Sequence, residues 1–294
     1  QLVTMASKYI VIIGPTASGK SDLALHLAQN IGGVIVNSDS QQVYKELRVL
    51  SARPTMAEEK LAPHYLYGVL SGEVTCSAIM WKNMVKDVLQ AESRPIIFCG
   101  GTGLYLHGLW NAVAEVPPIP DEVKEKVRAM ETADVAAYFG AEASDNHRRN
   151  VRALEVFLAT GKHLKEWQAE QPPADFNADD FLILVMNVPR ETLYQKINDR
   201  FLMMLENGAM EEVQKLRKMK LDATLPIMKA HGVPELISHI EGTMGHNEAI
   251  EKASQNVRNY AKRQLTWIRN QLPHKIEVQN MSYENILELV RKNI

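Results

Sequence analysis

Residues 14–21 read Gly-Pro-Thr-Ala-Ser-Gly-Lys-Ser, which fits the phosphate-binding pattern G-x-x-x-x-G-K-[ST] at every fixed position. An apolar, β-branched run at 9–13 precedes this motif, and an amphipathic pattern typical of a helix follows it at 20–30. A glycine-rich turn between a strand and a helix directs backbone N–H groups and the positive end of the helix toward one anion. The motif therefore predicts a bound diphosphate or triphosphate, without indicating which molecule carries it.

Two residues of the motif have distinct predicted roles. Lys20 neutralises a terminal phosphate, and the Ser21 hydroxyl binds a magnesium ion, Mg2+. The predicted phosphate-binding residues are Gly14, Pro15, Thr16, Ala17, Ser18, Gly19, Lys20 and Ser21.

Short apolar runs alternate with helical patterns through the first hundred residues. Strands are predicted at 9–13, 33–37, 66–70 and 95–99, and helices at 20–30, 77–91 and 102–110. A strand at 181–186, helical patterns over 191–271, a short strand at 275–279 and a final helix follow. This order predicts an α/β fold: a P-loop NTPase-like parallel sheet core flanked by helices. A small helical insertion and additional C-terminal helices complete the predicted architecture.

Proline-rich segments mark the predicted domain boundaries. The run at 116–120 contains three prolines, and the chain after it is charged and helical to about residue 168. A second proline pair at 172–173 precedes the return to the sheet. We therefore predict a catalytic core formed by residues 5–118 and 145–294, and a short helical insertion at 119–144.

Charge and composition exclude several classes of protein. The formal net charge of the 294 residues is −2, so a globally basic nucleic-acid coat is excluded, although a local basic face is not. Cys76 and Cys99 lie in ordinary apolar or strand-like contexts, which favours a reducing, cytoplasmic location and no cysteine metal site. No apolar run approaches the length of a membrane span. Residues before Met5 resemble a tag remnant or trimmed leader. We expect no membrane contact and a monomer.

Two candidate functional side chains follow predicted strands. Asp39 comes after the strand at 33–37, and Thr102 lies in the glycine-rich turn after the strand at 95–99. In open parallel sheets the carboxyl ends of the strands line the ligand crevice, where an aspartate can bind magnesium or accept a proton. Considered alone, each residue is equally well explained as a turn or helix cap.

Basic side chains gather on two predicted helices. Arg258, Lys262 and Arg269 fall within an arc of about 40° at 100° per residue, with an apolar face broadly opposite that contains Val257, Tyr260, Ala261, Gln264, Trp267 and Ile268. Arg148, Arg149 and Arg152 cluster near the start of another helix. Such stripes suit a phosphodiester backbone, although a solvated helix face is the ordinary explanation of a single one.

Several short motifs occur in one order along residues 9–270. They are 14–21, 39–44, 51–54, 100–105, 149–156, 190–194, 229–235 and 262–269. Together they resemble the tRNA dimethylallyltransferase (tRNA isopentenyltransferase) family. The first motif alone is generic, whereas the ordered set is specific.

The resemblance implies a prenyl transfer. The phosphate-binding loop holds dimethylallyl diphosphate with Mg2+, rather than ATP, and Lys20 and Ser21 stabilise the departing diphosphate. Asp39 is the general base for the N6 amine of an adenosine, and Thr102 lies near the allylic diphosphate and the target base. The catalytic residues carried over are Asp39, Thr102 and Lys20.

The implied acceptor is the anticodon stem-loop of tRNA. The target is adenosine 37, beside the 3′ end of the anticodon, in tRNAs that read codons beginning with U, and the products are N6-isopentenyladenosine and diphosphate. Gln41 and Gln42 read base edges, and the basic side chains hold phosphates. The implied tRNA-binding residues are Asp39, Ser40, Gln41, Gln42, Thr102, Lys124, Arg148, Arg149, Arg152, Lys229, Lys262, Arg263 and Arg269.

The chain departs from the family pattern in two places. The segment between Pro120 and Asp145 is short for the family's insertion, and residues 229–234 differ from the commoner pattern, in which Ile-Gly-Tyr follows a basic residue and one other. Three alternatives remain: an adenylate isopentenyltransferase, a P-loop small-molecule kinase and a non-catalytic RNA-binding protein. Basic helices disfavour the first, and the missing arginine lid weakens the second. Intact Lys20, Ser21 and Asp39 disfavour the third.

Overall fold

A six-stranded parallel sheet organises the larger part of the chain, with the strand order β3-β2-β4-β1-β5-β6. This computed structural model describes residues 7–294, so the expectation about the segment before Met5 lies outside the described residues. The strands are β1 (Tyr9–Ile13), β2 (Val34–Asn37), β3 (His64–Tyr65), β4 (Ile96–Gly100), β5 (Phe181–Val185) and β6 (Ile276–Glu277). The predicted parallel α/β core is confirmed.

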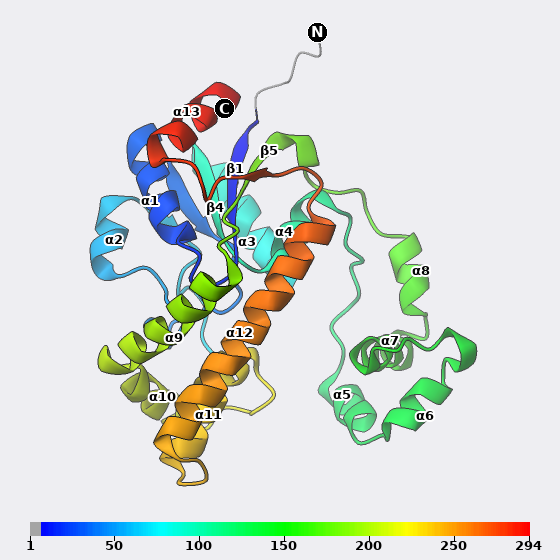
Figure 1. Ribbon diagram of the computed structural model, residues 1–294. Coiled ribbons are helices and arrows are strands. Elements are labelled where there is room, and N and C mark those ends of the chain that lie inside the picture. The colour runs from blue at the N-terminus through cyan, green and yellow to red at the C-terminus, as the bar shows by residue number, and fades with distance from the viewer. Residues whose placement is uncertain (1–6) are drawn as a thin grey trace. The chain divides into compact units, whose positions relative to one another are not determined.

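Alternation along the strands explains why helices cover both faces of this sheet. Val11 and Ile13 pack in one apolar cluster, while Ile10 and Ile12 pack in another. Helices α1 and α13 lie on one side of the sheet in Figure 1, and α3 and α4 lie on the other. The bounds of the helices before residue 111 and of the last helix are α1 (Lys20–Ile31), α2 (Met56–Leu61), α3 (Ala78–Ala91), α4 (Gly103–Trp110) and α13 (Tyr283–Asn293).

Four α-helices and a short 3-10 helix extend beyond the carboxyl ends of the strands. They are α9 (Arg190–Glu206), α10 (Ala209–Lys218), η3 (Pro226–Lys229), α11 (Val233–Ile240) and α12 (His246–Gln271). Helix α12 has 26 residues and runs from α11 back toward α4 (Figure 1). Its buried side chains include Val257, Ala261, Gln264 and Ile268, which confirms the predicted inner face.

Residues 111–175 form a separate compact unit. It contains α5 (Asp121–Arg128), α6 (Thr132–Ala137), η1 (Gly140–Glu142), α7 (His147–Thr160) and α8 (Leu164–Ala169). Val127, Val135 and Leu154 form its buried apolar cluster. The unit is larger than the insertion predicted at 119–144, because Leu154 of α7 packs in one apolar cluster with residues of α5 and α6.

Two local predictions differ from the structure. The strand predicted at 66–70 is instead β3 at His64–Tyr65, because Leu66 adopts a positive φ of 65° and ends the extended run. Helix α2 was not predicted; its Thr55 cap accepts a hydrogen bond from the Glu58 backbone N–H. Between residues 7 and 294, no helix is both long and apolar enough to cross a membrane.

Candidate active site

The phosphate-binding motif forms a tight loop between β1 and α1. Gly19 caps the N-terminus of α1 with a φ of 89°, a backbone conformation that residues with a side chain rarely adopt. A Cβ on Gly14 would lie 2.7 Å from the carbonyl oxygen of Met186, so the loop passes directly against the end of β5. Lys20 Nζ donates a hydrogen bond to the carbonyl of Pro15 at 3.2 Å, which folds the ammonium back over the loop. Burial lowers the pKa of Lys20, and the nearby negative charge of Asp39 partly opposes that effect.

Asp39 is held by a turn at the end of β2. The Asp39 backbone N–H donates to Asn37 Oδ1 at 2.7 Å, and Asn37 Nδ2 donates to the carbonyls of Asp39 and Leu66 at 2.9 and 3.0 Å. Asp39 Oδ1 accepts a hydrogen bond from the Gln41 backbone N–H at 2.9 Å. The carboxylate therefore has a fixed place at the sheet edge.

Thr102 joins the loop after β4 to the loop after β2. Its backbone N–H donates to the Ser38 carbonyl at 3.2 Å, and its Oγ1 accepts the Ser40 backbone N–H at 2.9 Å. A Cβ on Gly100 would lie only 2.3 Å from the Ser38 carbonyl carbon. Close backbone approach at Gly100 thus brings Thr102 and Asp39 to the same edge, as the sequence predicts.

Gln264 of α12 ties the phosphate-binding loop to the β4 loop. Its Oε1 accepts the Thr16 backbone N–H at 3.0 Å, and its Nε2 donates to the Gly101 carbonyl at 2.9 Å. The side chain is buried. The sequence pattern predicts that Gln264 lies on the inner face of the helix but indicates no role for it at the site. A glutamine on the otherwise largely apolar inner face of α12 was the one sequence feature that could have indicated a polar contact there.

Arg200 of α9 is a site residue that no local sequence motif predicts. Its guanidinium donates a hydrogen bond to Thr16 Oγ1, so an arginine does reach the phosphate-binding loop. Burial lowers the pKa of Arg200, and the negative charge of Asp39 opposes the shift. The signal in the sequence was its spacing, because Arg200 follows the buried residues Leu193 and Ile197 by seven and three positions.

These side chains surround one cavity beside the phosphate-binding loop. Its polar wall contains Thr16, Asp39, Gln41, Ser51, Arg200, His231 and Tyr260, and its apolar wall contains Leu50, Ile197, Phe201, Met204 and Val257. Thr16 of the phosphate-binding loop, a carboxylate and an apolar wall therefore line a single space. The cavity is small, and in it a carboxylate and a guanidinium face apolar side chains.

His231 and Tyr260 form an aromatic pair in this wall, with ring centroids 4.5 Å apart. Burial lowers the pKa of His231 to about 4, while Asp39 raises it and Arg263 and Arg200 lower it further. The imidazole is therefore neutral at neutral pH. Burial also raises the pKa of Tyr260, which keeps the phenol protonated.

Gln41 and Gln42, the two glutamines predicted to read base edges, form hydrogen bonds within the protein. Gln42 Nε2 donates to the carbonyls of Ser51 and Ala52 at 3.0 and 2.9 Å, and Gln41 Oε1 accepts the His231 backbone N–H at 3.2 Å. Gln42 Nε2 therefore holds the 51–52 turn, and base reading by Gln42 remains a prediction. Gln41 lines the cavity and retains its amide nitrogen toward other partners.

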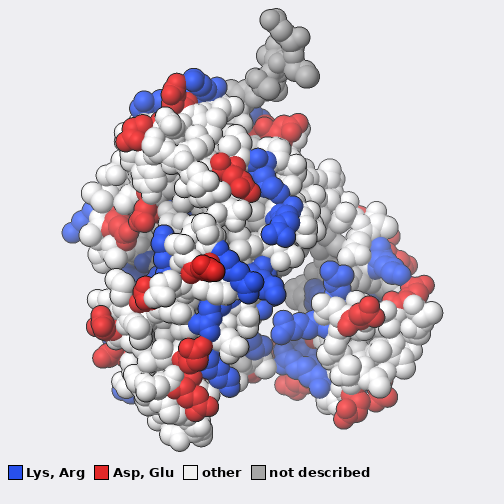
Figure 2. Space-filling model, in the orientation of Figure 1, with Lys and Arg blue, Asp and Glu red and all other residues white. Residues whose placement is uncertain are grey.

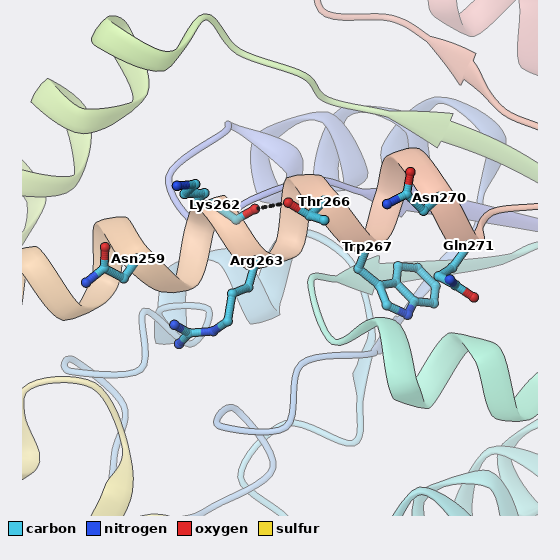
Figure 3. A pocket seen from close by; sticks show the side chains of 7 residues that line it. All are labelled: Asn259, Lys262, Arg263, Thr266, Trp267, Asn270 and Gln271. Atoms are coloured by element: carbon cyan, nitrogen blue, oxygen red, sulfur yellow. Dashed lines mark hydrogen bonds between the residues drawn. The ribbon is translucent and has the colours of Figure 1, made fainter. Parts of the chain in front are cut away.

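An open pocket lies along the outer side of α12. Figure 3 shows Arg263 and Trp267 extending from one side of the helix, and the pocket is also lined by Asn259, Lys262, Thr266, Asn270 and Gln271. A Cβ on Gly103 would lie 2.2 Å from the Trp267 ring, so the indole packs closely on the start of α4. Lys and Arg side chains gather over α12 in Figure 2. Polar residues and two cations, Lys262 and Arg263, therefore line this pocket beside the indole of Trp267.

The basic stripe differs from the prediction at one position. Lys262, Arg263 and Arg269 are exposed, as is Lys229 before α11. Arg258 is instead half-buried: its guanidinium donates to Asn198 Oδ1 and Glu251 Oε1, both at 2.7 Å. Arg258 is thus neutralised within the protein and does not belong to the exposed stripe.

The remaining predicted RNA contacts belong to the second unit. Lys124 lies on α5 and pairs with Asp121 at 2.8 Å. Arg148, Arg149 and Arg152 are exposed on α7, and Arg152 lies 3.9 Å from Glu155. Exposed pairs of this kind are weak and yield readily to a stronger anion.

The sequence profile described as IPP transferase matches residues 42–271. A tRNA dimethylallyltransferase of Bradyrhizobium sp. (strain BTAi1) is 46% identical over 282 residues, which cover 91% of this chain and 92% of the relative. One from Rhodopseudomonas palustris (strain BisA53) is 45% identical over 284 residues, covering 91% of this chain and 86% of the relative.

Solved structures give the same result. The tRNA delta(2)-isopentenylpyrophosphate transferase of Staphylococcus epidermidis has a TM-score of 0.68 and 32% identity, with 97% of each chain covered. A eukaryotic dimethylallyltransferase acting on tRNA has a TM-score of 0.77, covering 98% of this chain and 78% of that chain. Its 24% identity supports a shared fold.

Proposed function

Because this chain belongs to the IPP transferase family, we propose that it is a tRNA dimethylallyltransferase. It transfers the dimethylallyl group of dimethylallyl diphosphate to N6 of adenosine 37 in tRNAs that read codons beginning with U. The products are N6-isopentenyladenosine and diphosphate. The observation that carries the proposal is one cavity that joins the phosphate-binding loop, Asp39 and an apolar wall.

The diphosphate would bind at residues 14–21. Backbone N–H groups of the loop and the positive end of α1 attract the anion, and Lys20 supplies a full positive charge. Arg200 already touches the loop at Thr16, so its guanidinium is placed to share the same charge. Two cations next to a low-dielectric wall stabilise a departing diphosphate more than they would in water.

The residues present fit a bound Mg2+ ion. No group of three or more His, Cys, Asp or Glu side chains in residues 7–294 forms a metal site. Mg2+ typically takes one or two protein ligands and completes its shell with phosphate oxygens and water. Ser21, exposed at the start of α1, would provide one hydroxyl ligand. When bound, the ion would neutralise charge on the leaving diphosphate.

Asp39 would act as the general base, and Thr102 would position it. The bond between N6 and the allylic C1 forms as the bond from C1 to the diphosphate oxygen breaks. Diphosphate leaves with the electron pair, and a proton of N6 passes to the Asp39 carboxylate. Thr102 Oγ1 holds the Ser40 backbone N–H, next in the chain to Asp39, and so fixes the approach of the carboxylate.

The tRNA would approach over α12, and the target base must leave its stack to reach the cavity. Lys262, Arg263 and Arg269 are exposed there and suit phosphate oxygens. Lys124, Arg148, Arg149 and Arg152 of the second unit remain proposed tRNA contacts, as do Lys229, Ser40 and Gln41. Binding of tRNA explains these exposed cations, whereas AMP as the acceptor would not contact them.

We also propose a monomer that works in the cytoplasm, where tRNA is modified. Both cysteines are free, which agrees with a reducing compartment.

The substrate assay tests the activity directly. Purified protein, Mg2+ and labelled dimethylallyl diphosphate are offered unmodified tRNA, AMP, or ATP with candidate metabolites. Label in tRNA supports the proposal, whereas label in AMP alone, or phosphate release from ATP, contradicts it.

A further inference from the structure

His231 borders two spaces just before the start of α11. Its ring lines the inner cavity with Asp39, and it also lines an open pocket with Lys229, Asn259 and Arg263. The second pocket lies next to the basic side of α12. A single side chain therefore stands between the proposed reaction centre and the surface where the proposed tRNA contacts are exposed.

The imidazole carries an unused polar atom at this boundary. His231 Nε2 is fully buried, yet it makes no hydrogen bond within residues 7–294. Burying a polar group without a partner is costly, and among the six buried side-chain atoms that lack one in the described part of the chain, His231 Nε2 belongs to a residue that lines the cavity with Asp39. Two contacts hold this residue: the His231 backbone N–H donates to Gln41 Oε1, and its ring packs against that of Tyr260 at an interplanar angle of 53°.

We propose that His231 is a base-recognition residue, whose Nε2–H donates a hydrogen bond to a ring nitrogen of the adenine that enters the cavity. This inference rests on the proposed prenyl transfer. The edge of adenine carries an N6 amine with acceptor nitrogens beside it, N1 on one side and N7 on the other. With the amine facing the Asp39 carboxylate, the neighbouring atom of the base needs a donor.

The chemistry of the wall favours His231 for that donor. A neutral imidazole holds one N–H and brings no net charge to a site that already contains Lys20 and Arg200. Burial keeps the pKa of His231 near 4, so this neutral form persists at neutral pH. The guanine edge presents an oxygen acceptor where adenine has the amine, so the Asp39–His231 pair would also reject guanine.

The experiment compares His231→Leu with His231→Gln. Leucine removes the donor and keeps an apolar side chain, whereas glutamine restores an N–H. We expect His231→Leu to lower kcat/KM for tRNA by about 5- to 100-fold, as for a hydrogen bond lost in a buried site, with little change in the KM for dimethylallyl diphosphate. Glutamine should recover part of the loss. His246→Leu, at the exposed start of α12, is the matched control.

Atomic substitution of the substrate tests the contact itself. Anticodon stem-loops carrying 1-deazaadenosine or 7-deazaadenosine at position 37 remove one acceptor at a time. One analogue should slow the unaltered protein but cause no further loss in His231→Leu. Equal losses from both analogues in both proteins, or equal activity of the Leu and Gln variants, would overturn the inference. Thermal unfolding checks that each variant folds.

The two proposals fail in different ways. If the unaltered protein transfers no label to tRNA, the proposed function is wrong and the recognition role falls with it. If the unaltered protein prenylates tRNA while His231→Leu has the same kcat/KM, only the recognition role is wrong.

Discussion

The backbone N–H of Thr16 donates a hydrogen bond to Gln264 Oε1 at 3.0 Å, across 248 positions of the sequence. Through the same side chain, Gln264 also binds Gly101. The late helix α12 therefore fixes the shape of the phosphate-binding loop. The fold uses a helix of the proposed RNA-binding surface to support the proposed diphosphate site.

Replacement of Gln264 by leucine should damage both stability and diphosphate binding. Leucine leaves the half-buried Thr16 N–H and the buried Gly101 carbonyl without partners, a loss of about 1–3 kcal/mol in the free energy of unfolding. Urea denaturation measures that loss, and the KM for dimethylallyl diphosphate should rise. Gln255→Leu changes an exposed glutamine of the same helix and should leave both quantities unaltered.

Arg200→Lys tests the guanidinium beside the loop. Lysine keeps a positive charge but loses the planar set of donors, so it cannot hold Thr16 and a phosphate oxygen together. We expect kcat to fall by about 10²- to 10³-fold, the usual effect of removing one donor from a developing negative charge. Steady-state kinetics measure the change, with Lys196→Gln on the exposed side of α9 as control. An unchanged kcat would place Arg200 outside the reaction.

Asp39→Asn separates the proton acceptor from the turn that holds it. Asparagine retains an Oδ1 for the Gln41 backbone N–H, so the loop should keep its conformation. Turnover should nevertheless fall by about 10²- to 10⁴-fold, since an amide is a very poor base. Single-turnover rates and tRNA binding are measured together. Retained turnover would show that another group takes the proton.

Salt dependence tests the exposed cations of α12. Each phosphate contact that is lost should reduce the slope of log K against log salt by about 0.7–0.9. Lys262→Gln and Arg269→Gln should each show this reduction in tRNA binding. Arg258→Gln is the matched control, because Glu251 and Asn198 already bind that guanidinium. Equal slopes for all three variants would remove α12 from the binding surface.

Local sequence patterns predicted the parts of the site that are set by the backbone. Residues 14–21, Asp39 and Thr102 each follow a strand of one parallel sheet, so their convergence is a consequence of topology. Arg200 and Gln264 could not be placed in this way, because only the packing of α9 and α12 brings them to Thr16. For the same reason the insertion predicted at 119–144 is shorter than the observed unit at 111–175. Leu154 and Val127 share one apolar cluster although they are far apart in sequence, so no local pattern predicts their packing.

The buried imidazole of His231 should make stability depend on pH. Its pKa is about 4 in the folded protein, mainly because of burial, against an ordinary value of 6.5. Asp39, Arg200 and Arg263 are the charged groups that act on it. Between these two values the unfolded chain binds more protons, so the free energy of unfolding decreases as pH falls from about 6.5 to 4. His231→Leu should reduce this slope in thermal or urea unfolding across the same range. An identical slope would mean that the imidazole titrates as it does in the unfolded chain.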